Sequence, residues 1–138
     1  MRIRIHEDLR VYQLAYKLAM EIFEKTKSYP TVERYSLIDQ IRRSSRSICA
    51  NIAEAFRVRR YPNHFISKMS ISECEAAETQ VWVKFSHDCG YIDKSEFDYL
   101  FSQYNIVLGM LVNMIRDSER WCIKPEKVET RDENKFDF

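Results

Sequence analysis

Glycine and proline are scarce in this chain: its 138 residues include only two glycines and three prolines. Proteins rich in β-strands need such residues at frequent turns, so their scarcity favours long helices joined by short connections. No segment approaches the roughly 18 uncharged apolar residues of a membrane-spanning helix. The N-terminal residues MRIRIHEDLR also lack the apolar stretch and cleavage site of a secretory signal. We therefore expect a helical protein that stays in the cytoplasm and does not enter a membrane.

The sequence also lacks the motifs of metal-dependent and catalytic bundles. A di-metal bundle needs Glu-x-x-His pairs, and none of the three histidines follows a glutamate at that spacing. The four cysteines contain no C-x-x-C pair of the kind that binds zinc, and we expect them to be reduced. Two glycines cannot build a phosphate-binding loop. We expect no metal, no cofactor and no enzymatic activity.

Two further sets of side chains have a functional and a structural interpretation. Glu73, Glu75 and Glu78 could be metal ligands or catalytic carboxylates, but without a histidine partner a solvated or salt-bridged helix face is favoured. Six tyrosines could stack on nucleobases, although packing in the core or at an interface is the commoner role of such residues. These tyrosines are Tyr12, Tyr16, Tyr61, Tyr91, Tyr99 and Tyr104.

Apolar residues recur at helical spacing in four segments, which predicts helices over about residues 9–27, 32–60, 62–88 and 94–121. Asp8, Thr31 and Asp93 are predicted to cap the first, second and fourth helices. Pro62 suits the first turn of the third helix, and Gly90 suits its end. Because the connections are so short, neighbouring helices must run antiparallel. We predict an all-α, up-down-up-down four-helix bundle over residues 1–121, followed by a polar tail over residues 122–138.

The first and fourth predicted helices carry two further signals. The apolar face of the first helix is unusually wide, because Tyr12, Tyr16 and Met20 extend the stripe that begins at Val11. Such a face suggests a second contact surface and therefore self-association. Gly109 lies inside the fourth helix, where it is predicted to mark a close approach of another helix.

The most distinctive segment covers residues 33–60, in which all seven basic residues are arginine. Small and apolar residues form one helical stripe: Ile38, Ile41, Ser45, Ile48, Ile52 and Ala55. Arg42, Arg43 and Arg46 lie off this stripe and close together, and Arg57, Arg59 and Arg60 crowd its end. Arginine pairs with phosphate or carboxylate through two parallel hydrogen bonds. These residues could therefore bind a nucleic acid, or could pair with carboxylates of the third helix or of another subunit.

Charge and polarity leave both interpretations open. Residues 1–60 carry 13 basic and 7 acidic side chains, whereas residues 61–138 carry 9 basic and 14 acidic ones. This asymmetry favours either an anionic partner or the pairing of basic with acidic helices. Asn51 and Glu54, one turn apart, are predicted to have a structural role as an interhelical hydrogen-bond network or a helix-end clamp.

Three stretches of the sequence resemble the bacterial four-helix bundle family, also called the 23S rRNA intervening-sequence protein family. They are LRVYQLAYKLAMEIFEKTKSYP, ERYSLIDQIRRSSRSICANIAEAFRVRRYPNHF and ETQVWVKFSHDCGYI. The resemblance extends from about residue 7 to 121 and is most specific at QIRRS, Ser47 and NIAE. The family commonly has glycine after this glutamate, where the chain has Ala55.

The resemblance implies a bundle that assembles into a ring-like homopentamer. Some members are encoded in insertions within rRNA genes, and related bundles are accessory proteins of retroelement reverse transcriptases. We therefore expect a non-enzymatic oligomer that binds RNA or DNA. Its candidate contacts are Arg42, Arg43, Arg46, Arg57, Arg59 and Arg60. The alternative is a protein-interaction scaffold, for a reverse transcriptase or another protein, in which arginine–carboxylate contacts join subunits and nucleic acid has no role.

Overall fold

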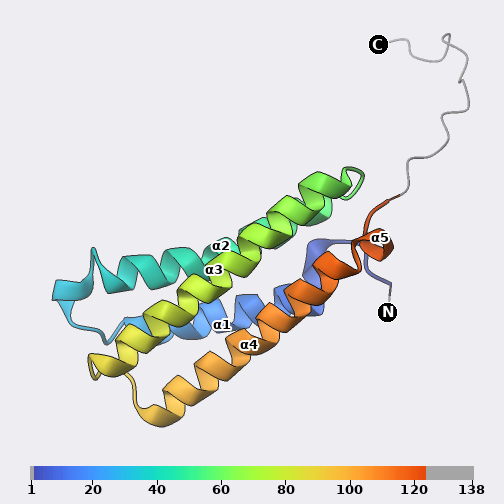
Figure 1. Ribbon diagram of the computed structural model, residues 1–138. Helices are drawn as coiled ribbons and strands as arrows, with labels where there is room; N and C mark the ends of the chain where they lie inside the picture. The colour runs from blue at the N-terminus through green and yellow to red at the C-terminus, as the bar shows by residue number, and fades with distance from the viewer. Residues whose placement is uncertain (1, 124–138) are drawn as a thin grey trace, which may run out of the picture.

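Four long helices form the protein in the computed structural model, which describes residues 2–123. They are α1 (Arg10–Thr26), α2 (Leu37–Arg57), α3 (Pro62–Asp88) and α4 (Lys94–Arg116) (Figure 1). Three short helical turns accompany them: η1 (His6–Asp8), η2 (Thr31–Glu33) and α5 (Ser118–Trp121). Residues 2–123 contain no strand, so the prediction of an all-α protein is confirmed. Residues 124–138, most of the predicted tail, lie outside the described residues.

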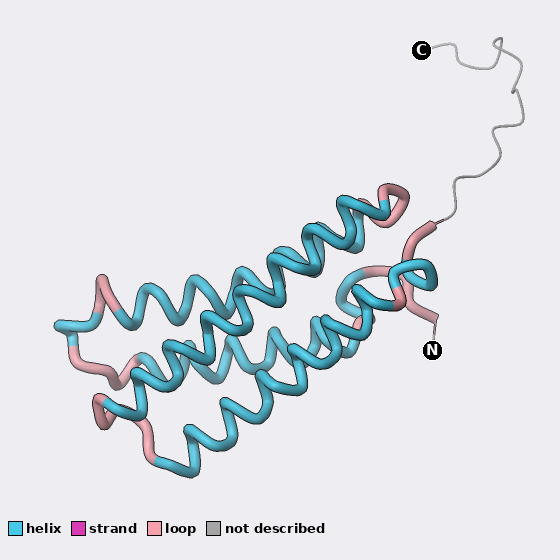
Figure 2. Tube along the Cα trace, viewed as in Figure 1, coloured by secondary structure: helices cyan, strands magenta, loops and turns pink. Residues whose placement is uncertain are grey.

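Each long helix packs against two others, so that a single core lies between all four. α1 contacts α2 and α4, and α3 also contacts α2 and α4, while the α2–α3 pair has the most extensive interface. The connections lie at the two ends of the bundle (Figure 2). Side chains from all four helices are fully buried between them, including Leu18, Ile48, Val83 and Leu111. The apolar stripes predicted from helical spacing thus form the core.

The α2–α3 interface has the regular spacing of a coiled coil. Buried positions alternate in steps of three and four on α2, along the six-residue stripe predicted from sequence. α3 does the same with Phe65, Met69, Ser72, Ala76, Thr79, Val83 and Ser86. The α3 hydroxyls donate hydrogen bonds within this interface, from Ser72 to the Ile48 carbonyl and from Thr79 to the Ser44 hydroxyl, both 2.9 Å. α3 therefore turns small polar side chains towards the core.

Local signals located several helix ends correctly. Pro62 is the first residue of α3, and Gly90 follows that helix with a positive φ of 80°. The Asp93 carboxylate accepts a 2.8 Å hydrogen bond from the Glu96 N–H and caps α4. The predicted role of Asp8 was wrong, because its carboxylate accepts from the backbone N–H groups of Arg4 and Ile5 instead. Leu9 precedes α1 without a side-chain cap.

The second helix is shorter than predicted at both ends. Thr31 begins η2 and does not cap a long helix, and α2 starts at Leu37. Val32 and Tyr35 are more than four-fifths exposed, so no apolar side chain anchors this segment to the core before Leu37. α2 ends at Arg57, where the backbone of Val58 leaves the helical conformation, and Tyr61 is extended before Pro62. The predicted fourth helix is likewise divided, at Asp117, into α4 and α5.

The prediction for Gly109 was also wrong. A β-carbon at this position would meet no atom within 4 Å, apart from the backbone of its own helix and its chain neighbours. Gly109 faces the exposed side of α4, and no neighbouring helix of residues 2–123 approaches it.

Candidate nucleic-acid interface

The outer face of α2 carries three exposed arginines, Arg43, Arg46 and Arg57, and Arg60 is exposed in the turn that follows. At 3.6 residues per turn, the three helical arginines lie within about 60° of one another around the helix axis. They span about 21 Å along that axis. These arginines face outward because the small and apolar residues of α2 face α1 and α3. What each guanidinium group contacts depends on the neighbouring helices.

Arg42 is a structural residue in this arrangement. It is half-buried, its Nε donates a 2.8 Å hydrogen bond to Thr26 Oγ1, and its Nη2 lies 3.4 Å from the Phe23 carbonyl oxygen. The guanidinium group also lies 4.8 Å from the centre of the Phe23 ring. Phe23 and Thr26 belong to the last turn of α1, where carbonyl groups lack backbone N–H partners within the helix; the Phe23 carbonyl also accepts a hydrogen bond from the Thr26 hydroxyl. Arg42 therefore binds the C-terminal end of α1 to α2.

Arg43 pairs with a carboxylate of α3. Its Nη2 lies 3.2 Å from Glu78 Oε1 and 3.3 Å from Gln40 Oε1. Glu78 also accepts a 3.3 Å hydrogen bond from the Trp82 indole N–H. Burial, together with the neighbouring Glu78, raises the pKa of Glu75 in this cluster. The favoured interpretation of these glutamates as a salt-bridged face thus describes Glu78 well.

Arg59 is turned back onto its own chain. Its Nε donates a 2.9 Å hydrogen bond to the Phe56 carbonyl oxygen, and its guanidinium group lies 3.5 Å from the centre of the Phe56 ring. Burial lowers the pKa of Arg59, and its carbonyl oxygen accepts a hydrogen bond from the Ile123 N–H. Arg59 therefore joins the end of α2 to the segment after α5.

The remaining three arginines face outward. Within residues 2–123, Arg46, Arg57 and Arg60 have no carboxylate at ion-pair distance. The Arg46 guanidinium group lies 5.6 Å from the centre of the Phe23 ring, and that of Arg60 lies 5.4 Å from the centre of the Tyr61 ring. The six predicted residues thus divide into two structural arginines, one ion-paired arginine and three with free charge among the described residues.

Asn51 and Glu54 make different contacts. Asn51 Nδ2 donates to the carbonyl and hydroxyl oxygens of Ser47, one turn earlier in the same helix. Glu54 forms a 2.8 Å ion pair with Lys68 across the α2–α3 interface. The predicted interhelical contact is therefore made by Glu54 alone. Lys68 was not predicted as its partner, because the helical spacing of α2 carries no information about which residue of α3 lies opposite.

The outward side of α3 is unexpectedly apolar, a feature that the sequence analysis missed. Ile71, Val81 and Phe85 are 40%, 49% and 52% exposed, and Cys74 and Ala77 are exposed between them. We call these five residues the outer α3 stripe. A groove of about 450 Å³ lies beside it, between α3 and Phe97 and Phe101 of α4. The sequence contains a pattern that could have predicted this stripe, because α3 carries a second series of apolar residues at helical spacing beside its buried series.

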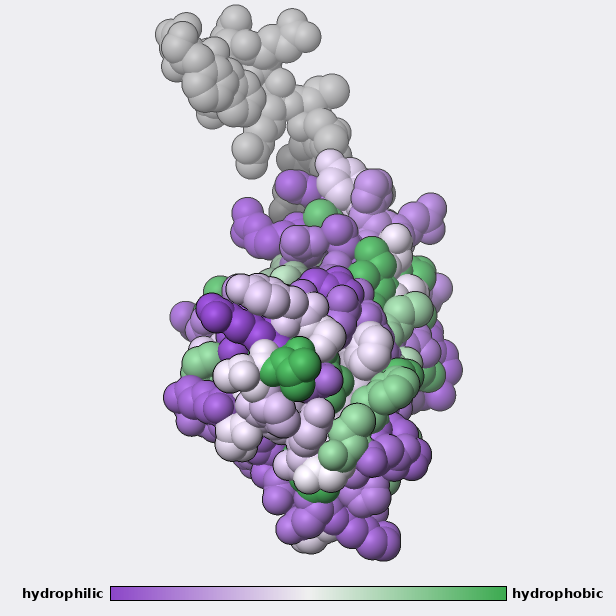
Figure 3. Space-filling view, turned by 90° about the vertical axis from the view of Figure 1, so that its left-hand side faces the viewer, coloured by the Kyte–Doolittle hydropathy of each residue, from purple (hydrophilic) through white to green (hydrophobic). Residues whose placement is uncertain are grey.

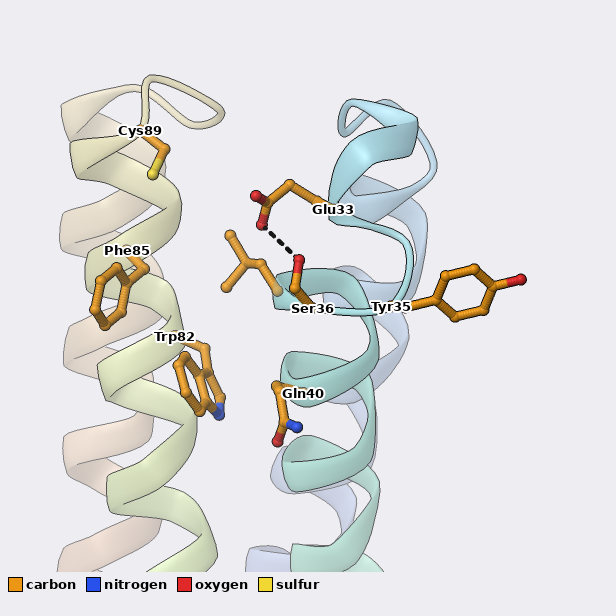
Figure 4. A pocket seen from close by; sticks show the side chains of 8 residues that line it. Glu33, Tyr35, Ser36, Gln40, Trp82, Phe85 and Cys89 are labelled. Atoms are coloured by element: carbon orange, nitrogen blue, oxygen red, sulfur yellow. Dashed lines mark hydrogen bonds between the residues drawn. The ribbon is translucent and has the colours of Figure 1, made fainter.

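A second groove, also of about 450 Å³, lies between the start of α2 and the end of α3. Figure 4 shows Trp82 and Phe85 of α3 on one side and Glu33 and Gln40 on the other, while Tyr35 points away from the groove. Seen from this end of the bundle, hydrophobic residues reach the surface between hydrophilic ones (Figure 3). This groove therefore has both aromatic and polar lining residues.

The described residues show neither a metal site nor a membrane span. Residues 2–123 contain no group of three histidine, cysteine, aspartate or glutamate side chains that could hold a metal ion. None of their helices is long and apolar enough to cross a membrane. All four cysteines are free thiols.

Comparison with known proteins places the chain in a family. A solved structure from Bacteroides thetaiotaomicron VPI-5482, described as a protein of unknown function from the S23 ribosomal protein family, is 25% identical to it. That structure matches with a TM-score of 0.69 and covers 77% of this chain and 95% of its own. No curated protein matches the chain. The family model described as 23S rRNA-intervening sequence protein matches residues 7–113. The chain therefore belongs to the 23S rRNA-intervening sequence protein family.

Proposed function

We propose that this protein is a non-enzymatic, oligomeric bundle that binds RNA or DNA through phosphate contacts to Arg46, Arg57 and Arg60. One observation carries the proposal: these guanidinium groups are unpaired with any carboxylate of residues 2–123. Arginine binds phosphate through its planar fork of N–H donors. Arg43 can join the site only by leaving Glu78. Such a role places the protein in the cytoplasm, where ribosomal RNA is found.

Phosphate contacts carry little sequence information but depend strongly on salt. Each phosphate that a cation neutralises contributes about 0.7 to 0.9 to the slope of log affinity against log salt concentration. Three arginines predict a slope of about −2 to −3. Binding is therefore expected to be weakly sequence-specific. Its affinity should fall more steeply with salt concentration than that of binding through apolar contacts.

The test compares two triple variants in an electrophoretic shift or anisotropy assay with rRNA fragments, at about 50 and 200 mM salt. Replacing Arg46, Arg57 and Arg60 by glutamine is expected to weaken binding and to flatten the salt slope. Replacing Lys84, Lys94 and Arg116 by glutamine removes the same charge from α3 and α4 and is expected to have a smaller effect. Equal effects of the two variants, or no binding by the wild type, would refute the proposal.

We further propose that copies of the chain associate through the outer α3 stripe, as the pentamer that the family resemblance implies. Its residues are exposed on the outer side of α3, so the outer stripe lacks a covering element among the described residues. Light scattering tests this proposal. Val81→Glu, which adds a charge to the stripe, is expected to reduce the mass of the particle. A wild-type monomer at micromolar concentration would refute it.

We propose an up-down-up-down topology for the four helices. Contacts between neighbouring helices support this topology, because residue numbers rise along one helix as they fall along its neighbour, as expected for antiparallel helices. Arg43 contacts Glu78 and Glu54 contacts Lys68 between α2 and α3. Between α1 and α4, the corresponding pairs are Glu21–Tyr99 and Lys25–Glu96. Between α3 and α4 they are Gln80–Asn105 and His87–Phe97. Crosslinks at these positions in solution test the topology.

The alternative function is a protein-interaction scaffold without nucleic-acid binding. The Arg43–Glu78 ion pair favours it, because it shows an α2 arginine used for an arginine–carboxylate contact. Under this alternative the free arginines meet carboxylates of another subunit or of a partner such as a reverse transcriptase. The Arg46/Arg57/Arg60 variant would then lose assembly or partner binding, and the wild type would not shift rRNA fragments.

A further inference from the structure

The α1–α2 boundary places an aromatic ring among several cations. The Phe23 ring of α1 has the guanidinium groups of Arg42 and Arg46 at 4.8 and 5.6 Å from its centre. The ammonium group of Lys27 lies 4.8 Å from the same centre. Arg42 is held by its hydrogen bonds to α1, but Arg46 is exposed. Arg46 thus belongs both to the outer face of α2 and to the edge of α1.

Two further rings continue from Phe23 along α1. Tyr12 and Tyr16 are stacked, with ring centres 6.0 Å apart and planes inclined by 26°. Tyr16 is 53% exposed, whereas Tyr12 is half-buried. Burial raises the pKa of Tyr12 further above its ordinary value, so its phenol carries no negative charge near pH 7.

The three rings lie on one side of α1. Residues 12, 16 and 23 fall within about 40° around a helix axis, and Tyr16 and Phe23 are about 10 Å apart along it. We call Tyr12, Tyr16 and Phe23 the α1 aromatic stripe. This stripe faces the α2 side of the molecule, because Phe23 contacts Arg42 and Arg46. Phe23 therefore links the cations to one end of this stripe.

The other side of Tyr16 carries charges of both signs. It borders an open groove of about 660 Å³ between α1 and α4, which Met20 and Tyr99 also line. Glu21 and Glu24 lie in this groove together with Lys17 and Lys25, so its lining has no net charge. Arg46 has no carboxylate partner among residues 2–123. A nucleic-acid chain at Tyr16 would therefore keep its phosphates on the Arg46 side and direct its bases across the tyrosine ring.

We propose that the nucleic acid bound by this protein is single-stranded, with an unpaired base stacked on the exposed ring of Tyr16 while phosphates further along the strand contact Arg46. This inference rests on the proposed function and adds the class of ligand. In a duplex both faces of each base are covered by its neighbours, so a duplex can offer the arginines its phosphates but cannot stack a base on Tyr16. Stacking accepts any base, because every base has an aromatic face.

The experiment measures the anisotropy of a labelled, unstructured 20-nucleotide RNA, the same sequence as DNA, and a duplex of that sequence. The wild type is expected to bind either single strand more tightly than the duplex. Tyr16→Leu is expected to weaken single-strand binding by about tenfold, within the range measured for loss of one stacked base, and to leave duplex binding unchanged. Tyr16→Phe keeps the ring and is expected to retain the preference.

Tyr35→Leu is the matched control, because Tyr35 is 84% exposed and has the Arg34 guanidinium group 5.4 Å from its ring centre. This variant is expected to bind like the wild type. Equal binding of strand and duplex, or a Tyr16→Leu variant with unchanged affinity, would overturn the inference while leaving the arginine-dependent function intact. A Tyr16→Leu variant with an altered assembly state by light scattering would show a protein contact there and would also overturn it. Absence of all binding would refute both proposals.

Discussion

Arg42 and Arg46 are one turn apart in α2, and replacing each by alanine should affect different properties. Arg42 makes a charged hydrogen bond of 2.8 Å to Thr26 Oγ1 and lies over the Phe23 ring. A hydrogen bond to a charged group contributes about 1.5–3 kcal/mol, and a cation–π contact near the surface contributes about 0.5–1 kcal/mol. The 3.4 Å contact with the Phe23 carbonyl adds little. We expect Arg42→Ala to lower the free energy of unfolding by about 2–3 kcal/mol.

Thermal and urea unfolding followed by circular dichroism measure this loss. For a chain of this size, 1 kcal/mol changes the melting temperature by roughly 3–4 °C, so Arg42→Ala should lower it by about 8 °C. Arg46→Ala removes an exposed side chain with only a 5.6 Å ring contact, and we expect a loss of less than about 1 kcal/mol. Arg42→Lys keeps the charge but not the fork of donors, and its stability should lie between those of Arg42→Ala and the wild type.

Nucleic-acid binding should give the opposite order. At a temperature where both variants are folded, Arg46→Ala is expected to reduce affinity for an RNA strand more than Arg42→Ala does. Equal destabilisation by the two variants would refute the structural role of Arg42. A folded Arg42→Ala variant that loses as much affinity as Arg46→Ala would show that Arg42 also reaches the phosphates.

Three further predictions concern the α2–α3 surface and the thiols. Glu78→Gln frees Arg43 from its ion pair and should steepen the salt slope of RNA binding by roughly one phosphate contact; an unchanged slope would exclude Arg43 from the site. Glu75→Gln should raise the melting temperature at about pH 7.5, because the raised pKa of Glu75 makes its ionised form unfavourable in the fold. This gain in melting temperature should vanish below pH 4.5, the ordinary pKa of the glutamate, because Glu75 is then protonated in both the folded and the unfolded protein. A gain that persists at low pH would contradict this explanation. Burial raises the pKa of Cys49 to about 11, so mass spectrometry should find thiol reagents on exposed Cys74 before Cys49; simultaneous labelling would contradict this order.

The amino-acid sequence by itself determined the helices and most of the core. Its 3.6-residue periodicity identified the buried stripe of α2, because apolar residues on one side of a helix must leave water together. Pro62, Gly90 and Asp93 marked helix ends through their own backbone and side-chain preferences, which need no distant partner. Asp8 and Thr31 were wrongly predicted to cap long helices, because a residue type that is common at helix caps is also common in short turns.

Only the tertiary structure decided what the arginines do. Spacing along α2 gives the direction of each side chain around its own helix, but the partner depends on how far α1 and α3 are shifted along their axes. That offset placed Arg42 on the end of α1, Arg43 opposite Glu78, and Arg46 beside Phe23 without a carboxylate from residues 2–123. It also placed three small hydroxyl side chains of α3 in the core and left an apolar stripe on its outer side. Such contacts join residues far apart in the chain, so local spacing cannot specify them.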